Sequence, residues 1–137
     1  MPTIDQIRAH FSNDRFATQA AEIRIVEAQP QYAVCEMPIL EKHRNARGTP
    51  MGGAIFTLAD FAAAVAANGF AEQTDTISLH ADITFLSAAK GSRLIAKASC
   101  IRQGRTTALY EVEITDELGT LVARASVNGF VLQRAEK

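Results

Sequence analysis

The sequence predicts an α+β fold in which an antiparallel sheet packs against one long central helix. An uninterrupted helical stretch runs from residue 52 to 69, and the segments before and after it alternate between apolar and polar side chains, as strands do. Short turns join these strands, which favours antiparallel pairing with the helix on one face of the sheet. A chain of 137 residues suits a single hydrophobic core, so we expect one domain over residues 1–137.

The segment before the central helix predicts a short helix, a hairpin and a loop. Apolar residues recur at helical spacing within residues 3–13, where Thr3 is a suitable N-cap. Two β-like runs, 22–28 and 32–39, are separated by a turn that contains a proline. A polar loop follows over residues 40–51, and loops of this composition often carry functional residues.

The helix expected over residues 52–69 is rich in alanine, is preceded by a proline and ends at Asn68 and Gly69. It is apolar on nearly every side, so we expect it to be buried nearly all round. One small sheet cannot cover every face of a helix. The sheet must therefore curve strongly around this helix, or a partner subunit must share it.

After the central helix the pattern changes to a period of two residues. Residues 76–86 alternate most clearly, residues 94–102 less so, and residues 107–115 and 120–132 complete a set of four strands. A turn at residues 116–119 joins the last two strands as a hairpin. In the first of these strands one face carries Ile77, Leu79, Ala81, Ile83 and Phe85, and the polar face carries Thr76, Ser78, His80, Asp82 and Thr84.

The composition indicates an ordinary globular protein with no bulk attraction for nucleic acid. It is 47% hydrophobic and 21% charged, with a net charge of −1. Cys35 and Cys100 lie in apolar or alternating runs, so we expect buried free thiols. The N-terminus lacks a signal-peptide pattern, and Asp60 in the middle of the longest apolar stretch argues against a membrane span. The cytoplasm is therefore the expected location.

Asp60 is the only ionisable side chain between residues 48 and 71. A carboxylate among apolar residues loses hydration, which disfavours its charged form and destabilises the fold unless partners compensate. Such a residue is either part of a functional site or the acceptor of structural hydrogen bonds from a loop or a partner subunit. The residues alone leave both readings open.

Gly52 and Gly53 stand at the expected start of the central helix, where backbone N–H groups lack partners and the helix dipole is positive. Without a side chain in the way, a carbonyl oxygen that gains negative charge can be polarised there, although a plain turn into the helix is the alternative. Asp60 lies about 12 Å further along the helix. An antiparallel partner helix would bring one chain's Asp60 beside the other chain's Gly52, which predicts a site across a dimer interface.

The stretch NARGTPMGGAIFTLAD, from Asn45 to Asp60, resembles the signature of the PaaI-like hotdog thioesterases, in which an Asn, a Gly, a His-Gly-Gly and an Asp recur at this spacing. Residues 83–91, 104–106 and 116–123 are similar to later parts of the same family. The resemblance implies the hotdog fold, an antiparallel sheet wrapped around a long central helix. It also implies hydrolysis of acyl-CoA thioesters by a homodimer that assembles further into a homotetramer.

The resemblance also implies roles for individual residues. Asp60 would be the general base or nucleophile, and the Gly52 N–H group would polarise the thioester carbonyl. Asn45 of the partner subunit would position the water or the thioester, and Ser78 would assist the water. The residues expected to contact the substrate, including the phosphates of its coenzyme A (CoA), are Met51, Gly53, Arg105 and Lys90. Because CoA is part of the substrate, no separate cofactor and no metal are expected.

Met51 departs from the family pattern, because the family has histidine at this position. Methionine carries no proton, so hydrolysis would persist if the histidine mainly supports the loop and would weaken if it orients the substrate. His43 in the same loop could take the place of the family histidine, or it could simply be a solvent-exposed loop residue. A non-catalytic acyl-CoA binding module, a dehydratase or hydratase, and a helix that serves only oligomerisation are the competing functions. The identity of the acyl group stays open.

Overall fold

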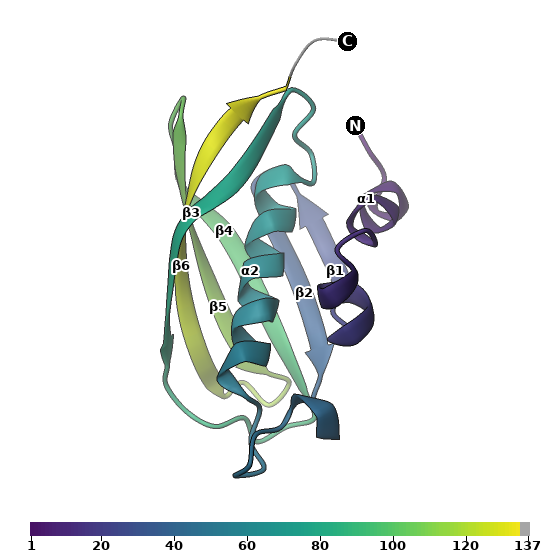
Figure 1. Ribbon diagram of the computed structural model, residues 1–137, viewed down its shortest axis with the longest axis vertical. Coiled ribbons are helices and arrows are strands. Elements are labelled where there is room, and N and C mark those ends of the chain that lie inside the picture. The colour runs from purple at the N-terminus through teal and green to yellow at the C-terminus, as the bar shows by residue number, and fades with distance from the viewer. Residues whose placement is uncertain (135–137) are drawn as a thin grey trace.

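A six-stranded antiparallel sheet curves around one long helix in the computed structural model, which describes residues 1–134 (Figure 1). The predicted α+β class and the predicted number of strands are confirmed. Along the chain the elements are α1 (Ile4–Phe11), η1 (Phe16–Ala20), β1 (Arg24–Gln29), β2 (Tyr32–Pro38), η2 (Glu41–His43), α2 (Gly52–Asn68), β3 (Thr74–Phe85), β4 (Arg93–Gln103), β5 (Thr107–Asp116) and β6 (Leu121–Gln133).

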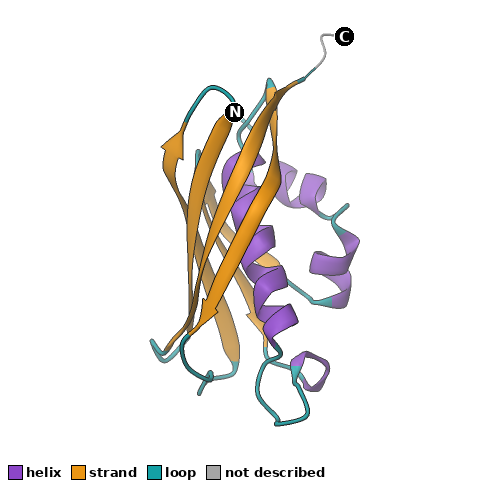
Figure 2. Cartoon of the chain, turned by 60° about the vertical axis from the view of Figure 1, so that its left-hand side comes forward, coloured by secondary structure: helices purple, strands orange, loops and turns teal. Residues whose placement is uncertain are grey.

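The strand order is β1-β2-β4-β5-β6-β3, so β1 and β3 are the two free edges of the sheet. Strands and helices form two layers, with all helices on the same side (Figure 2). The core lies between α2 and the sheet. The face of β5 that packs against α2 is the apolar one that the alternation predicts, with Ala108, Tyr110, Val112 and Ile114 all buried.

The N-terminal helix begins as predicted, because Thr3 accepts a hydrogen bond from the backbone of Gln6 while the Gln6 side chain bonds back to Thr3. Phe11 is buried and meets Phe61 of α2 edge to face, with ring centroids 5.8 Å apart. The sequence did not predict the π-helix η1 or the 3₁₀-helix η2. Both are too short for a helical periodicity to show.

Within the single chain, the curved sheet does not bury α2 nearly all round. The sheet covers one side of the helix and α1 with η1 covers part of another, which leaves one lengthwise strip uncovered in the single chain. This strip, called the open stripe below, consists of exposed or half-buried residues at helical spacing: Gly53, Thr57, Asp60, Ala64 and Ala67. The remaining possibility, that a partner subunit shares the helix, is the one that this arrangement favours.

The alternation expected for β3 is also wrong at its centre, because an extra residue interrupts it. Ser78 pairs with Gly129 but His80 pairs with the adjacent Asn128, so Leu79 forms a β-bulge. Directly paired residues of antiparallel strands point to the same face, and Gly129 lies on the buried face of β6. Ser78 therefore points towards α2, whereas Ile77 lies on the outer face and is exposed.

Two smaller expectations concern the cysteines and the membrane. Cys35 and Cys100 are both free, Cys35 is buried and Cys100 is half-buried. Burial raises the pKa of the Cys35 thiol to about 12, which keeps it protonated and unreactive. Over residues 1–134 no helix is both long enough and apolar enough to cross a membrane.

Candidate active site

His43 holds the loop before α2 and does not substitute for the family histidine. Its ring is buried: Nδ1 accepts a hydrogen bond from the Leu40 N–H at 3.0 Å, so Nε2 carries the proton and donates it to the Ala21 carbonyl at 2.8 Å. Its own carbonyl accepts the Met51 N–H at 2.7 Å. Both suggested roles for His43, a substitute in the site and a solvated loop residue, are therefore wrong.

The start of α2 presents unpaired backbone donors. The Met51 carbonyl accepts from Ala54 and Ile55, but no group within residues 1–134 accepts the N–H groups of Gly52 and Gly53. The Met51 side chain is 52% exposed and caps nothing. These two N–H groups are thus available to a ligand oxygen at the positive end of the helix dipole.

The aromatic ring of Phe85, at the end of β3, lies against Gly52. A Cβ atom at Gly52 would stand only 3.1 Å from Cζ of this ring, closer than most real contacts of such atoms. Glycine at this position therefore permits both the approach of the ring and access to the helix N-terminus. The Phe85 ring forms a wall beside the two free N–H groups.

Asn45 shapes the loop that leads to Gly52. Its Oδ1 atom accepts the N–H groups of Arg47 at 3.0 Å and Thr49 at 3.2 Å, and Gly48 completes the turn in a left-handed conformation. The side-chain N–H groups of Asn45 form no hydrogen bond within residues 1–134 and remain available. These groups surround a cavity of about 390 Å³, whose lining includes Asn45, Arg47, Gly52, Phe85, Ser87 and Ala89.

Asp60 lies on the open stripe and lines a different cavity, of about 370 Å³, together with Asp14, Phe16, Thr57 and Phe61. The residue is exposed in the single chain, yet the partial burial of its carboxyl raises the pKa, and the negative charge of Asp14 raises it further. No donor of residues 1–134 hydrogen-bonds this carboxylate. The structural role that the sequence left open, as an acceptor for a neighbouring loop, is therefore absent from this part of the chain.

One chain does not bring the predicted catalytic residues together. The cavity at Gly52 and the cavity at Asp60 have no lining residue in common. Ser78 lies beyond Asp60, where it lines a small cavity with Ala63, Ala64 and Ala67 of α2. This position differs from the polar outer face expected for Ser78, and the bulge at Leu79 is the reason.

The two basic candidates are also far apart within one chain. Lys90 and Arg105 precede and follow β4, whose 11 residues span about 36 Å. Lys90 is exposed, and its neighbour Ala89 lines the cavity at Gly52. Arg105 lies in the turn before β5, at the opposite end of the sheet.

Asp116 is a structural residue of the site that sequence patterns show only as part of a turn. Its buried carboxylate accepts backbone N–H groups from both sides, of Lys90 and Gly91 before β4 and of Leu118 and Thr120 in the β5–β6 hairpin. Burial alone would raise the pKa of Asp116, but these donors outweigh it and hold the pKa well below its usual range. Asp116 thereby fixes the turn that borders the Gly52 cavity.

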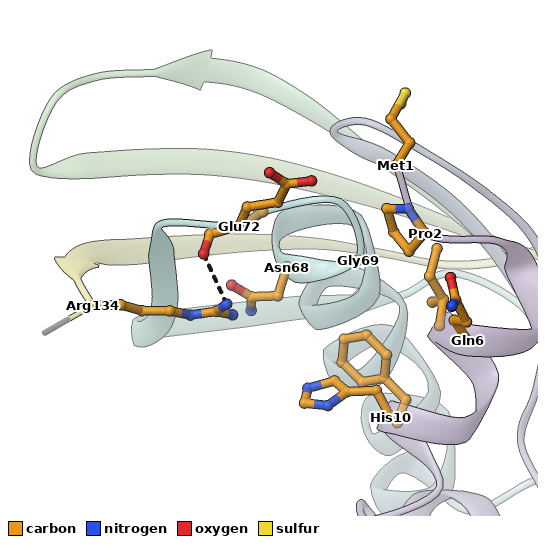
Figure 3. Close-up of a pocket in the computed structure, with 11 residues that line it drawn as sticks. Met1, Pro2, Gln6, His10, Asn68, Gly69, Glu72 and Arg134 are labelled. Carbon is orange, nitrogen blue, oxygen red and sulfur yellow. Dashed lines mark hydrogen bonds between the residues drawn. The ribbon is translucent and has the colours of Figure 1, made fainter. Parts of the chain in front are cut away.

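A larger cavity, of about 470 Å³, lies at the other end of α2, between α1 and the segments next to the start of β3 and the end of β6 (Figure 3). His10, Asn68 and Arg134 line it, and Arg134 donates to the Glu72 carbonyl at 3.1 Å. None of the predicted site residues lines this cavity. Within residues 1–134, no three or more His, Cys, Asp or Glu side chains gather as a metal site.

Comparison with known proteins identifies the family. The family model described as the thioesterase superfamily matches residues 48–123. Human acyl-coenzyme A thioesterase 13 is 32% identical over 120 residues, which cover 86% of each chain. Acyl-coenzyme A thioesterase PaaI of Escherichia coli is 31% identical over 116 residues, covering 84% of this chain and 81% of the relative.

A solved structure agrees with this assignment. A hypothetical thioesterase of Streptococcus pneumoniae, solved with coenzyme A, has a TM-score of 0.81 at 29% identity over 91% of this chain and 99% of the other. The residues that the family model matches include Gly52, Asp60 and Ser78. The chain therefore belongs to the thioesterase superfamily, as a PaaI-like thioester hydrolase with the hotdog fold.

Proposed function

We propose that this chain hydrolyses acyl-CoA thioesters at a site that two subunits share. The observation that carries the proposal is the separation of two complementary groups on one chain. The free N–H groups at Gly52 and the unpaired carboxylate of Asp60 line separate cavities, about 12 Å apart along the same helix. Two antiparallel copies of α2 would place the carboxylate of each chain beside the N–H groups of the other.

Two features of the surface support such a dimer. The open stripe leaves the small side chains of α2 uncovered, which allows a second helix to approach closely. The 12-residue strand β3 is a free edge with unpaired backbone groups, and it borders the open stripe where Ser78 meets Ala64 and Ala67. A partner that extends the sheet at β3 also covers the stripe. We propose at least this dimer, and a tetramer made of two such dimers.

The chemistry assigns one step to each group. Asp60 takes a proton from water as the water attacks the thioester carbon, and its raised pKa makes it a stronger base. The Gly52 N–H group of the partner subunit stabilises the negative charge on the carbonyl oxygen. Collapse of this intermediate breaks the carbon–sulfur bond, and the departing thiolate recovers the proton. Direct attack by Asp60 on the carbonyl carbon is the alternative route.

The remaining residues of the site would orient the reactants. The free side-chain N–H groups of Asn45 would hold the thioester or the water, while its Oδ1 atom keeps the loop in shape. Ser78 would assist the water from the strand beside α2. Met51 and Gly53 would contact the substrate without proton transfer.

Coenzyme A would bind along the Gly52 cavity. Arg47 lines this cavity and Lys90 stands at its border, so both offer positive charge to phosphates. Arg105 is too distant within the same chain, but an antiparallel partner would bring its own Arg105 to this end of the sheet. The coenzyme A held by the streptococcal relative supports this class of ligand.

Thiol release from a series of acyl-CoAs tests the proposal, with wild type beside Asp60→Asn. We expect turnover by the wild type and at least a ~100-fold loss in the variant if Asp60 is the base. Asp5→Asn, which removes an exposed carboxylate of α1 that lines neither the Gly52 cavity nor the Asp60 cavity, is the matched control and should retain full activity. A folded Asp60→Asn protein with the original rate would refute this mechanism.

Met51 favours a second candidate, a binding module that holds acyl-CoA without hydrolysing it. Its side chain offers neither a proton nor a strong hydrogen bond at the helix start. This function predicts a higher melting temperature with acyl-CoA and no release of thiol, even for the wild type. If that result is obtained, Met51→His is the variant in which hydrolysis should reappear.

A further inference from the structure

The cavity beside Asp60 has a wall that the proposed chemistry leaves without a role. This wall is the segment 14–17, which leads into the π-helix η1, and Phe16 is its largest side chain. Phe16 is 71% exposed in the single chain, although the other phenylalanine beside this cavity, Phe61, is buried. An aromatic ring beside a cavity offers a ligand a large apolar surface, and π-helical turns are frequent at functional sites.

We propose that this cavity receives the acyl group of the thioester and that Phe16 determines which acyl groups fit. The inference rests on the proposed function and deepens it, since it names the substrate class as neutral, apolar acyl groups. Thioester hydrolysis requires the acyl carbon to stand beside Asp60. The acyl chain must then extend either towards the Gly52 cavity or along the wall that contains Phe16.

Charge decides between these two directions. Coenzyme A carries several phosphate charges, and the Gly52 cavity offers Arg47 with Lys90 at its border. The cavity at Asp60 contains a second carboxylate, Asp14, with Arg15 as the one cation among its lining residues. The phosphate-bearing arm is therefore favoured on the Gly52 side, which leaves the Asp60 cavity to the acyl group. The two carboxylates also disfavour acyl groups that end in a carboxylate.

The wall is held firmly enough to discriminate between acyl groups. The Ala21 N–H group donates to the Phe16 carbonyl at 2.9 Å, and the Ala21 carbonyl accepts Nε2–H of buried His43 at 2.8 Å. The Ile23 N–H group donates to the Ala17 carbonyl at 2.9 Å, which joins the wall to the start of β1. Because this backbone is already ordered, little conformational entropy is lost when a ligand binds. The shape of the wall can therefore discriminate between acyl groups.

Binding of non-hydrolysable thioether analogues of acyl-CoA tests this inference independently of turnover. Acetyl, hexanoyl and phenylacetyl analogues are titrated into wild type, Phe16→Ala, Phe16→Leu and Leu118→Ala. Leu118 is the matched control, because its side chain is 68% exposed and lines neither cavity, and the substitution keeps the backbone N–H group that Asp116 accepts. Both positions are on the surface, so the three variants should fold.

We expect Phe16→Ala to weaken binding of the hexanoyl and phenylacetyl analogues by about tenfold and that of the acetyl analogue by less than about threefold. Phe16→Leu should restore much of the hexanoyl affinity, and Leu118→Ala should change none of the three. Equal effects of Phe16→Ala on all three analogues, or no effect, would overturn the inference. Thiol release by the wild type is measured separately. Absence of thiol release would count against hydrolysis, whereas unchanged binding of the analogues by Phe16→Ala would count against the acyl site.

Discussion

Asp60 and Asp116 are two carboxylates whose pKa values are displaced in opposite directions. Partial burial and the charge of Asp14 raise the pKa of Asp60, whereas backbone donors lower that of Asp116 below its usual range despite its burial. A raised pKa in the folded state means that the charged form of Asp60 destabilises the fold. A lowered pKa means that the charged form of Asp116 stabilises it.

Thermal melting over a range of pH separates the two carboxylates. Asp60→Asn should melt at a higher temperature than wild type at neutral pH, and the gain should vanish below about pH 4, where Asp60 is protonated in both states. Asp116→Asn should melt at a lower temperature at neutral pH, with the deficit shrinking as acid protonates Asp116 in the wild type. A loss of stability in Asp60→Asn at neutral pH would contradict this prediction and would show that donors of a second subunit compensate the charge of Asp60.

The contact between Gly52 and Phe85 predicts energetic coupling between these residues. In Gly52→Ala the new Cβ would push against the Phe85 ring, 3.1 Å away, and would shift the N–H group that we assign to the carbonyl oxygen. We expect a fall in kcat/KM with little loss of helix stability, since alanine favours helices. Phe85→Leu should relieve part of the defect in the double variant. Strictly additive effects on kcat/KM would rule out the coupling.

At the scale of elements, periodicity predicts most of this fold and fails at one strand. The bounds of α2 and of the hairpin strands agree closely with the sequence pattern, because long apolar runs and turn residues mark them. In β3 the alternation assigns the residues before Leu79 to the wrong face of the sheet, because Leu79 is an extra residue in the strand. Alternation between apolar and polar residues cannot show where such a bulge lies. The same shift places Ser78 on the helix side rather than on the outer face.

Deletion of Leu79 is the element-scale test of the bulge. Without Leu79, Ser78 and His80 become neighbours on opposite faces of a regular strand, as they are now, so the fold should survive with a small change in melting temperature. Deletion of Asp82 should be much more damaging, because a regular strand would then turn His80 towards α2. Circular dichroism melts of the two deletions compare them directly. Equal damage would mean that Leu79 is not the extra residue.

At the scale of the whole molecule, the sequence yields candidate site residues but not their arrangement in space. The family resemblance around Asn45, Gly52 and Asp60 pointed to these candidates, and the separation of Gly52 and Asp60 along one helix pointed to a second chain. The position of Phe16 beside Asp60 and the hydrogen bonds of Asp116 to the turn before β4 could not be predicted, because both depend on tertiary packing. The exposure of Asp60 in the single chain was also unpredictable from composition, since apolar helices are usually covered by their own chain.

Mixed subunits test whether the site spans two chains. Asp60→Asn is co-expressed with Asn45→Asp, which keeps the oxygen that shapes the loop and removes the free amide donor. If each site takes Asp60 from one chain and Asn45 from the other, random pairing leaves about a quarter of the sites intact. Activity should therefore recover to about a quarter of the wild-type level. Sites confined to one chain would all remain defective, and no activity would return.

The free edge of β3 also affects the chain before the proposed dimer forms. A folded single chain exposes the unpaired edge of the 12-residue strand β3. The free N–H and C=O groups of such an edge can pair with strands of other proteins as well as with a second copy of this chain. The carboxylates of Asp75 and Asp82 along it limit mispairing without preventing it. Strong overexpression, with many unpaired chains present at once, should therefore drive this protein towards aggregates, and slow synthesis at low temperature should favour recovery of native assemblies.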